Sequence, residues 1–301
     1  MTRSTLTPPP LAPGARVALL SPAGPISDSA DLSRAESNAR SLGWDPVIFP
    51  GALARHGYLA GDDALRAADL NAAIRDPGID GIWCIRGGYG TMRVLNAIDY
   101  DALGKSPKAI IGYSDITALH CAIGASCDLV SYHGPNGRTV LTPFSRQSLA
   151  RATRRDGDPF EGAGAFSLCR DGSAAGPLIG GNLALLCALI GTAYAPLFDG
   201  AILVVEDVDE PLYRIDRMLR QLILSGALAR VAGLCFGSFT ERGDETSDAP
   251  RSLDVLFEEA AAHVRGPVAT GAPVGHLADQ WTLPLGARVE LSARGLALAT
   301  G

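Results

Sequence analysis

The 301-residue sequence predicts an α/β protein with two domains: a Rossmann-like N-terminal domain on a mostly parallel sheet and a smaller mixed α/β C-terminal domain. Three observations predict this class. From residue 16 to about residue 140, short apolar runs alternate with amphipathic stretches, which is the pattern of βαβ units. A polar segment follows, and a second series of strand-like and helix-like segments begins after it. The apolar content of 47%, with 19% charged residues, is sufficient for two buried cores.

The N-terminal domain is expected over residues 1–145. Its strands are the apolar runs near residues 17–20, 46–49, 81–85 and 109–111. Helices are expected near residues 29–42, 62–76 and 90–97, with another directly after residue 114. Short apolar strands separated by helices of this length indicate parallel pairing, with helices covering the sheet.

The segment 146–175 is rich in Arg, Asp, Gly and Ser and is expected to connect the domains. The C-terminal domain, residues 176–301, begins with a strand and a helix that Asn182 caps and Gly191 ends. A strand at 202–205 leads to the best-defined helix, about 213–225, whose apolar residues recur at the spacing of one helical face. Further strands are expected at 231–236, 267–269 and 287–299.

Charge and residue usage exclude several kinds of partner. A net charge of −6 and a pI near 5.4 provide no basic surface for nucleic acid or an anionic membrane. No apolar run has the length of a signal peptide or a membrane span, so a cytoplasmic protein is expected. The six cysteines show no C-x-x-C pairing and are interpreted as small buried residues, and no histidine or cysteine cluster predicts a metal site.

Ser114 is the strongest candidate for a catalytic nucleophile. The apolar run 109–111 leads into Gly112-Tyr113-Ser114-Asp115, and a helical segment leaves it. A strand, a sharp turn and a helix lift a hydroxyl above the end of a sheet and leave backbone N–H groups free for a developing oxyanion. The turn therefore suggests a serine hydrolase.

A serine nucleophile needs an imidazole as base, and the chain has five histidines. His120 falls on an apolar helical face and is interpreted as a hydrogen-bonded core residue. His56 and His263 have no local signature. His133, at a strand end on the side of Ser114, and His276, in a loop punctuated by glycine and proline, both remain candidates, with His276 favoured.

The base needs a carboxylate to orient it, and Glu206 is the first polar residue after a buried-looking strand. Asp207 follows directly, and the spacing alone leaves the two residues nearly equal. The alternative is a solvated acidic turn that caps the helix after Pro211, a role in which Asp209 is expected.

The segment Ile85-Arg86-Gly87-Gly88-Tyr89-Gly90 is a second turn from strand to helix. Its glycines allow backbone N–H groups to approach a ligand closely, so the turn is a candidate for part of an oxyanion hole. A phosphate site is disfavoured because neither the G-x-G-x-x-G spacing nor a Walker lysine is present.

Several short motifs occur in one order along nearly the whole chain, and together they are specific. They are Ser21-Pro22-Ala23-Gly24, Arg86-Gly87-Gly88-Tyr89-Gly90, Gly112-Tyr113-Ser114-Asp115-Ile116-Thr117, His133-Gly134-Pro135, Gly180-Gly181-Asn182-Leu183, the block from Glu206 to Arg217, and Gly275-His276 followed by Leu283-Pro284-Leu285-Gly286. The chain closely resembles the LD-carboxypeptidases, the serine peptidase family that includes the muramoyl-tetrapeptide carboxypeptidases and the microcin-immunity hydrolases.

The resemblance implies roles that the local patterns leave open. Ser114 would be the nucleophile on the first domain, and the second domain would supply His276 as general base and acid with Glu206 to orient it. No metal and no cofactor is implied. The family is typically a cytoplasmic homodimer that acts on murein peptides.

The implied reaction is hydrolysis of the bond between the L-centre of meso-diaminopimelate and the terminal D-alanine of a recycled murein tetrapeptide. The N–H of Asp115, with one from Gly87 or Gly88, would hold the oxyanion. Arg86 or Arg138 is expected to pair with the terminal carboxylate, because an exopeptidase must recognise that charge. His133 is a further candidate for substrate contact.

Three other functions are considered as alternatives. A microcin-immunity-type hydrolase of peptidyl nucleotides is disfavoured because the short chain leaves little room for an inserted recognition loop. A non-catalytic peptide-binding protein is disfavoured because all three triad residue types are present. An ordinary α/β-hydrolase normally has G-x-S-x-G, whereas Ile116 replaces the last glycine here.

Overall fold

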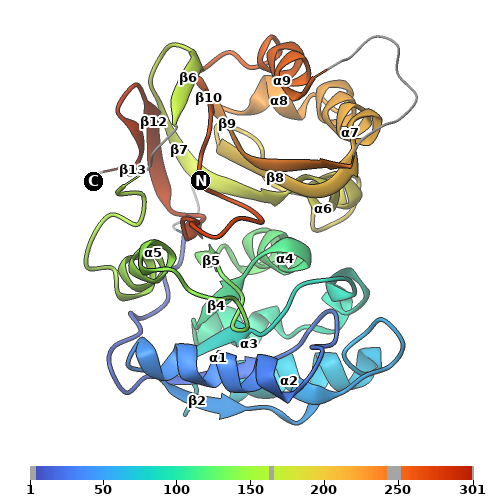
Figure 1. Ribbon diagram of the computed structural model, residues 1–301, viewed down its shortest axis with the longest axis vertical. Helices are drawn as coiled ribbons and strands as arrows, with labels where there is room; N and C mark the ends of the chain where they lie inside the picture. Colours follow the sequence, from blue (N-terminus) through green and yellow to red (C-terminus); the bar gives the residue numbers. More distant parts are fainter. Residues whose placement is uncertain (1–4, 163–165, 243–251, 300–301) are drawn as a thin grey trace.

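The computed structural model describes residues 5–162, 166–242 and 252–299. Figure 1 shows two α/β domains stacked along the long axis, with the first part of the chain in the lower domain and most of the second half in the upper one. Each domain has its own sheet. The predicted two-domain α/β class is therefore confirmed.

A six-stranded sheet forms the centre of the first domain, in the order β11-β5-β4-β3-β1-β2. All neighbouring strands are parallel except β11 and β5. The strands from the N-terminal half are β1 (Arg16–Leu20), β2 (Asp45–Ile48), β3 (Gly81–Cys84), β4 (Ala109–Gly112) and β5 (Ser131–His133). Every residue of β3, β4 and β5 is buried, as expected for central strands covered on both faces.

Helices cover both faces of this sheet. On one side are α1 (Ser29–Ser41) and α5 (Pro143–Arg154), and on the other α2 (Asp63–Arg75), α3 (Tyr100–Lys105) and α4 (Thr117–Cys127). Along β1, Val17 and Leu19 join the core beneath α1, whereas Ala18 and Leu20 join the opposite core. This alternation follows from the two-residue period of a strand and produces the three layers of a Rossmann-like domain.

The second domain is built on a seven-stranded mixed sheet in the order β13-β12-β7-β8-β9-β10-β6. Its four central strands are parallel, and β6, β12 and β13 pair antiparallel. The strands are β6 (Ser167–Arg170), β7 (Ala174–Asn182), β8 (Ile202–Pro211), β9 (Gly233–Arg242), β10 (Val268–Thr270), β12 (Arg288–Ser292) and β13 (Gly295–Leu298). Its helices are α6 (Leu183–Leu189), α7 (Leu212–Leu224), α8 (Ala227–Arg230) and α9 (Leu253–Ala261), and they share one core.

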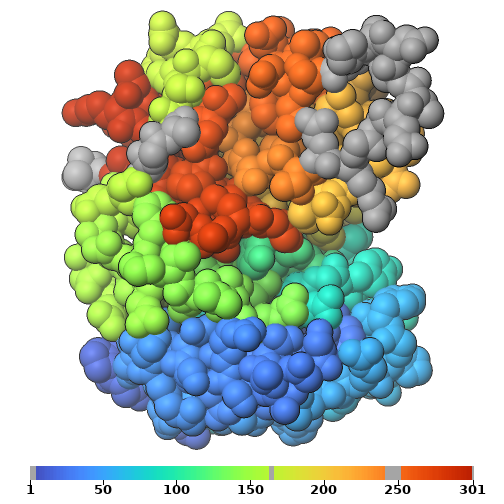
Figure 2. Space-filling model, in the orientation of Figure 1, coloured from blue at the N-terminus to red at the C-terminus, as the bar shows by residue number. Residues whose placement is uncertain are grey.

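The two domains are joined by a strand and by buried hydrogen bonds. The strand β11 (Leu283–Leu285) lies in sequence between β10 and β12 of the second sheet but pairs with β5 of the first sheet. The Asn182 N–H donates to the Thr117 hydroxyl at 3.0 Å, and the Thr282 N–H donates to the Ser148 hydroxyl at 2.8 Å. Figure 2 shows the red C-terminal segment packed against the green part of the first domain. The carboxyl end of β4 therefore faces the second domain.

The segment 146–175 contains regular structure where the sequence suggests a linker. Most of α5 lies within it, and Leu149 and Ala152 on the inner face of that helix are buried in the first domain. Arg151 and Arg154 lie in the last turn of α5, so this part of the polar cluster belongs to a helix. The strand β6 pairs with β10 at the edge of the second sheet.

Two local expectations are wrong. Residues 90–97 form the 3₁₀ turns Thr91–Arg93 and Leu95–Ala97 instead of a helix, because the Thr91 N–H donates to the buried Asp115 carboxylate at 2.8 Å. Asp209 does not cap α7, since no side chain caps that helix and the Asp209 N–H donates to the Thr240 hydroxyl.

Within the described residues, no helix has the length and hydropathy needed to cross a membrane. No group of three or more His, Cys, Asp or Glu side chains in those ranges is arranged to hold a metal ion. All six cysteines are free thiols. Cys84, Cys187 and Cys235 are buried as expected, but Cys169 is exposed on the edge strand β6.

Candidate active site

Ser114 lies just beyond β4 in a strained backbone conformation. Its φ is +66°, one of four positive values found for non-glycine residues in the described chain. The preceding Tyr113 is extended, and Ser114 begins the short 3₁₀ turn that leads into α4. A left-handed residue between a strand and a helix turns the chain sharply and presents its side chain above the sheet edge. The predicted strand, turn and helix are present.

The glycine turn after β3 lies directly against Ser114. A Cβ atom placed on Gly87 would lie 2.9 Å from the Ser114 Cβ and 3.1 Å from its Oγ. The Gly87 carbonyl accepts a hydrogen bond from the Gly24 N–H at 2.9 Å, and Gly88 has a φ of +101°. Only glycine fits this approach, so the turn brings backbone amides to the candidate nucleophile.

Asp115 connects the two turns. Its buried carboxylate accepts a hydrogen bond from the Thr91 N–H, which fixes the end of the glycine turn relative to Ser114. Within the described residues, the N–H groups of Gly87, Gly88 and Asp115 donate to no protein oxygen. These amides are available for a developing oxyanion, and the side-chain connection through Asp115 was not visible in the sequence.

The second domain contributes a buried carboxylate and an imidazole. The Glu206 side chain on β8 is 0% exposed, and its Oε2 lies 2.9 Å from Nδ1 of His276, which is 22% exposed. Gly275 has a φ of +117°, and a Cβ there would lie 2.7 Å from Oε2 of Glu206. The glycine before His276 therefore allows the loop between β10 and β11 to lie against Glu206.

The neighbouring Asp207 has a different environment. Its carboxylate accepts from Asn182 Nδ2 at 2.9 Å, from the Ala184 N–H at 3.1 Å and from the Val208 N–H. Burial raises the pKa of Asp207 to about 6, against the lowering effect of these hydrogen bonds. Asp207 thus holds the start of α6, where Asn182 caps the helix as predicted, and Glu206 is the carboxylate beside His276.

The His276 ring lies beside the turn that carries Ser114. The centroids of the His276 and Tyr113 rings are 4.9 Å apart with an interplanar angle of 55°. Tyr113 directly precedes Ser114, so the second domain brings the Glu206–His276 pair to the carboxyl end of β4. The sequence motif contains Tyr113 but does not reveal this contact.

His133 and His120 lie behind the site in the core. His120 is hydrogen-bonded as predicted, with its ring nitrogens 2.8 Å from the Ser131 hydroxyl and from the Gly112 carbonyl. His133 is 0% exposed, and both of its ring nitrogens are unpartnered. Burial lowers the pKa of His120 to about 4 and, with repulsion from His120 and His276, that of His133 to about 3. His133 therefore packs behind Tyr113 as a neutral ring and has no exposed surface for substrate.

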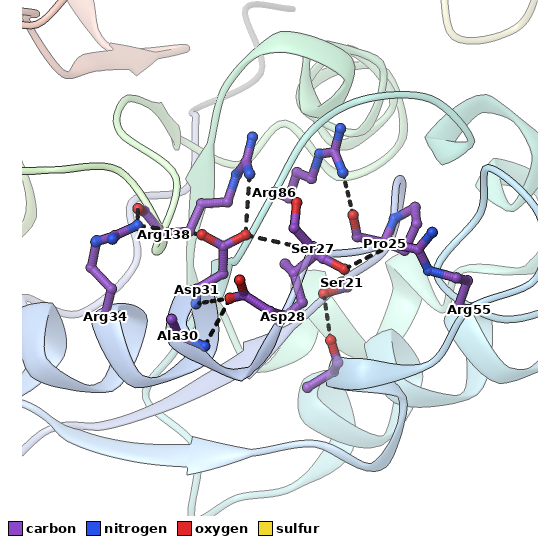
Figure 3. A network of polar contacts seen from close by, with 12 residues as sticks. Ser21, Pro25, Ser27, Asp28, Ala30, Asp31, Arg34, Arg55, Arg86 and Arg138 are labelled. Atoms are coloured by element: carbon purple, nitrogen blue, oxygen red, sulfur yellow. Dashed lines mark hydrogen bonds and ion pairs between the residues drawn. The ribbon is translucent and has the colours of Figure 1, made fainter.

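Arg86 and Arg138 lie close together near the amino end of α1. Arg138 pairs with Asp31 at 3.2 Å, and Arg86 donates to the Pro25 carbonyl. Figure 3 shows both guanidinium groups on the same side of Asp31, with Arg34 and Arg55 farther out. Asp31 was not singled out from the sequence, because its partner Arg138 lies 107 residues away.

Comparison with known proteins assigns the chain to a known family. Residues 17–134 match the model of the LD-carboxypeptidase N-terminal domain, and residues 175–291 match that of the LD-carboxypeptidase C-terminal domain. A relative from Streptomyces coelicolor is 39% identical over 97% of this chain and 94% of its own length. The chain belongs to the LD-carboxypeptidase family. It is thereby a member of a serine peptidase family, as the resemblance in its motifs indicates.

Other relatives agree with this LD-carboxypeptidase assignment. The murein tetrapeptide carboxypeptidase of Pseudomonas aeruginosa is 35% identical over 93% of this chain and 94% of its own. The crystal structure of muramoyltetrapeptide carboxypeptidase from Oxalobacter formigenes superposes with a TM-score of 0.80, at 30% identity over 94% of this chain and 97% of that one. The wild-type microcin C7 self-immunity protein gives a TM-score of 0.87 at 24% identity over 98% and 99% of the chains, which shows a shared fold.

Proposed function

We propose that this protein is a serine LD-carboxypeptidase that removes the terminal D-alanine from murein tetrapeptides. The observation that carries the proposal is the buried Glu206–His276 pair beside the left-handed Ser114 turn. A nucleophile, a base and an orienting carboxylate brought together where the carboxyl end of β4 meets the second domain form the arrangement used for acyl transfer. The substrate class comes from relatives at 30% identity or more that are named for murein tetrapeptides.

In the first step, the Ser114 hydroxyl attacks the carbonyl carbon of the L-centre of meso-diaminopimelate. His276 accepts the hydroxyl proton on Nε2, because its Nδ1 faces Glu206 at 2.9 Å. The carboxylate holds the imidazole in the tautomer that leaves Nε2 free and stabilises the imidazolium that forms. General base catalysis of this kind contributes about 10²- to 10⁴-fold to a rate.

The negative charge that develops on the carbonyl oxygen needs donors. The Asp115 N–H, with that of Gly87 or Gly88, supplies them, since these amides adjoin Ser114 and donate to no protein oxygen in the described chain. One such donor commonly contributes about 3 kcal/mol to lowering the barrier. The Asp115 carboxylate holds the donors in place through Thr91.

Collapse of the tetrahedral intermediate breaks the bond to D-alanine. His276 returns the proton to the departing amine, and Ser114 is left acylated by the peptide. A water molecule then attacks the acyl carbon while His276 accepts its proton, and the tripeptide leaves with Ser114 restored. Every proton in this cycle passes through one imidazole, so no metal or cofactor is required.

Incubation with murein tetrapeptide and detection of free D-alanine by mass spectrometry tests the proposal. Wild-type protein should release one D-alanine per peptide, and Ser114→Ala should lower kcat by about 10⁴-fold or more. Circular dichroism of the variant checks that it is folded. No release by the wild type, or equal release by Ser114→Ala, contradicts the proposal.

The alternative functions give other results in the same assay. A hydrolase of the microcin-immunity type would cleave a peptidyl nucleotide and leave the tetrapeptide intact, and a peptide-binding protein would bind the tetrapeptide without releasing D-alanine. The resemblance also implies a homodimer in the cytoplasm. Light scattering of the purified protein measures the first of these properties, and fractionation of the source cells measures the second.

A further inference from the structure

Two arginines lie at the carboxyl end of the first sheet, the end that carries the proposed nucleophile. In the first sheet β4 lies between β3 and β5, and Arg86 follows β3 whereas Arg138 follows β5. The loop after β5 is drawn across to β3, since the Gly137 N–H donates to the Cys84 carbonyl at 2.9 Å and the Arg138 N–H donates to the Ile85 carbonyl at 3.2 Å. Arg138 is thereby brought beside Arg86.

The cluster has more positive than negative charge. Asp31 accepts hydrogen bonds from Arg138 at 3.2 Å, from Arg34 at 3.3 Å and from the Ser27 N–H at 3.2 Å. Within the described residues, Arg86 and Arg55 form no ion pair. Arg86 donates to the Pro25 carbonyl, and Arg55 donates to the Ile26 carbonyl.

The other acidic group near the arginines, Asp28, already accepts hydrogen bonds from backbone N–H groups. The Asp28 carboxylate caps α1 by accepting from the Ala30 and Asp31 N–H groups. Burial and the neighbouring Arg138 lower the pKa of Arg86, against the opposing effect of Asp31. A bound anion would supply the missing negative charge.

Arg86 lies next to the glycine turn that contacts the candidate nucleophile Ser114. Nε of Arg86 is 3.7 Å from the position of a Cβ on Gly88, and the corresponding position on Gly87 is 3.1 Å from the Ser114 Oγ. Arg138 is close enough to Tyr113 to lower the pKa of its hydroxyl, against the larger effect of burial, and Tyr113 contacts His276. Figure 3 shows the two guanidinium groups side by side above Asp31.

We propose that Arg86 and Arg138 bind the terminal carboxylate of the substrate and that Asp31 positions Arg138 for this contact. This inference rests on the proposed function, because it concerns the residue released by that reaction. Guanidinium groups bind carboxylates through paired, charge-assisted hydrogen bonds. The site makes the enzyme an exopeptidase, since a peptide that continues past the scissile bond has no carboxylate at this position.

A comparison of murein tetrapeptide with its C-terminal D-alaninamide tests the proposal. The wild type should prefer the free acid by about 10- to 100-fold in kcat/KM, the range expected for hydrogen bonds to a charged group. Arg86→Met and Arg138→Met should raise KM for the acid and bring the preference close to one. Arg86→Lys should restore part of it, and Asp31→Asn should have a smaller effect than Arg138→Met.

Arg40→Met is the matched control. Arg40 is an exposed arginine near the other end of α1, paired with Glu36 at 3.1 Å. Its replacement should leave both kcat/KM and the preference for the free acid unchanged. Thermal unfolding of each variant separates a loss of recognition from a loss of folding.

The stem peptide has other carboxylates, and two further substrates distinguish them. One has L-lysine in place of diaminopimelate, and the other has the α-carboxylate of D-glutamate as an amide. If the arginine variants keep the wild-type preference for the free acid over the amide, the inference is overturned. It is also overturned if the arginine variants lose only the ability to distinguish diaminopimelate from lysine, or the D-glutamate α-carboxylate from its amide. If the wild type releases no D-alanine from any substrate, the proposed function itself fails.

Discussion

The two domains present their parts of the site in different ways. The first domain supplies Ser114 through its backbone, with a left-handed residue at the end of β4 and a glycine turn against it. The second supplies His276 through its side chains, with an imidazole bound to a carboxylate that is 0% exposed. The proposed nucleophile is thus positioned by local geometry, and the proposed base by a contact between residues 70 positions apart.

Because the two domains position their residues differently, different kinds of substitution should disturb each part of the site. Backbone geometry is disturbed by adding volume, because a new methyl group has no space at the turn. A buried carboxylate beside an imidazole is disturbed by removing its charge, because the imidazole then loses the group that orients it. Substitutions of these two kinds should therefore affect the two domains unequally.

The largest expected effect comes from removing the charge on the base side. Glu206→Gln keeps the shape of the side chain but no longer favours the tautomer of His276 that leaves Nε2 free, so kcat should fall by about 10³- to 10⁴-fold. Steady-state release of D-alanine measures it. Asp207→Asn is the control, since Asp207 holds α6, and it should lower the melting temperature with little change in kcat. Equal loss in both variants would refute the assignment of Glu206.

A smaller effect is expected from adding volume on the nucleophile side. Gly87→Ala places a Cβ 2.9 Å from the Ser114 Cβ and 3.0 Å from the Tyr113 carbonyl, so the turn must move. Displacement of the oxyanion donors by a fraction of an ångström to about 1 Å should lower kcat by about 10- to 100-fold. D-alanine release again gives the measurement.

Gly124→Ala is the control for this substitution. Gly124 lies in α4, and beyond its chain neighbours and the local helix backbone no heavy atom lies within 4 Å of its Cβ position. Alanine is the better helix former, so the variant should be slightly more stable and fully active. Gly87→Ala with wild-type kcat would show that the turn does not position the donors.

The smallest expected effect is on the free energy of unfolding, whose dependence on pH should differ between buried groups of the two domains. His120 and His133 of the first domain have pKa values of about 4 and about 3 in the folded protein, below the ordinary 6.5. As pH drops below 6.5, the unfolded chain therefore takes up protons before the folded protein does, and the free energy of unfolding falls. Asp207 of the second domain has a folded pKa of about 6, above its ordinary 3.8, so it adds stability as pH falls from 6 toward 3.8. Each group contributes about 1.4 kcal/mol per pH unit within its window.

Urea unfolding between pH 7 and pH 4 measures these slopes. His133→Leu should make the loss of stability in acid shallower, and Asp207→Asn should make it steeper, because it removes the opposing contribution. Parallel slopes in the wild type and both variants would contradict the assigned protonation states.

The locally determined part of the site was predictable from the sequence. The apolar run before Ser114 and the helical residues after it indicate the turn, because strand and helix periods change within a few residues. The glycines after β3 are equally visible, since close approach requires them. The parallel strands of the first sheet follow from the same alternation of strands and helices, but the addition of β11 to that sheet does not.

The parts that depend on distant contacts were not predictable from local patterns. Glu206 and Asp207 are adjacent acidic residues, and only their tertiary contacts distinguish them, since Glu206 lies against His276 and Gly275 whereas Asp207 accepts from Asn182 and Ala184. His133 is polar and at a strand end, yet α4 and the second domain bury it completely. The pairing of Asp31 with Arg138 likewise depends on the tertiary arrangement of α1 and the loop after β5.

The return of β11 to the first sheet has a consequence for biosynthesis. Leu283–Leu285 emerges from the ribosome after β6 to β10 of the second domain have been made, so β5 keeps an unpaired edge until that point. Exposed strand edges favour pairing with other chains, and the nascent first domain would need protection during this interval. The same event that closes this edge delivers the His276 loop, which lies just before β11, so the chain acquires its proposed base only when the first sheet is completed.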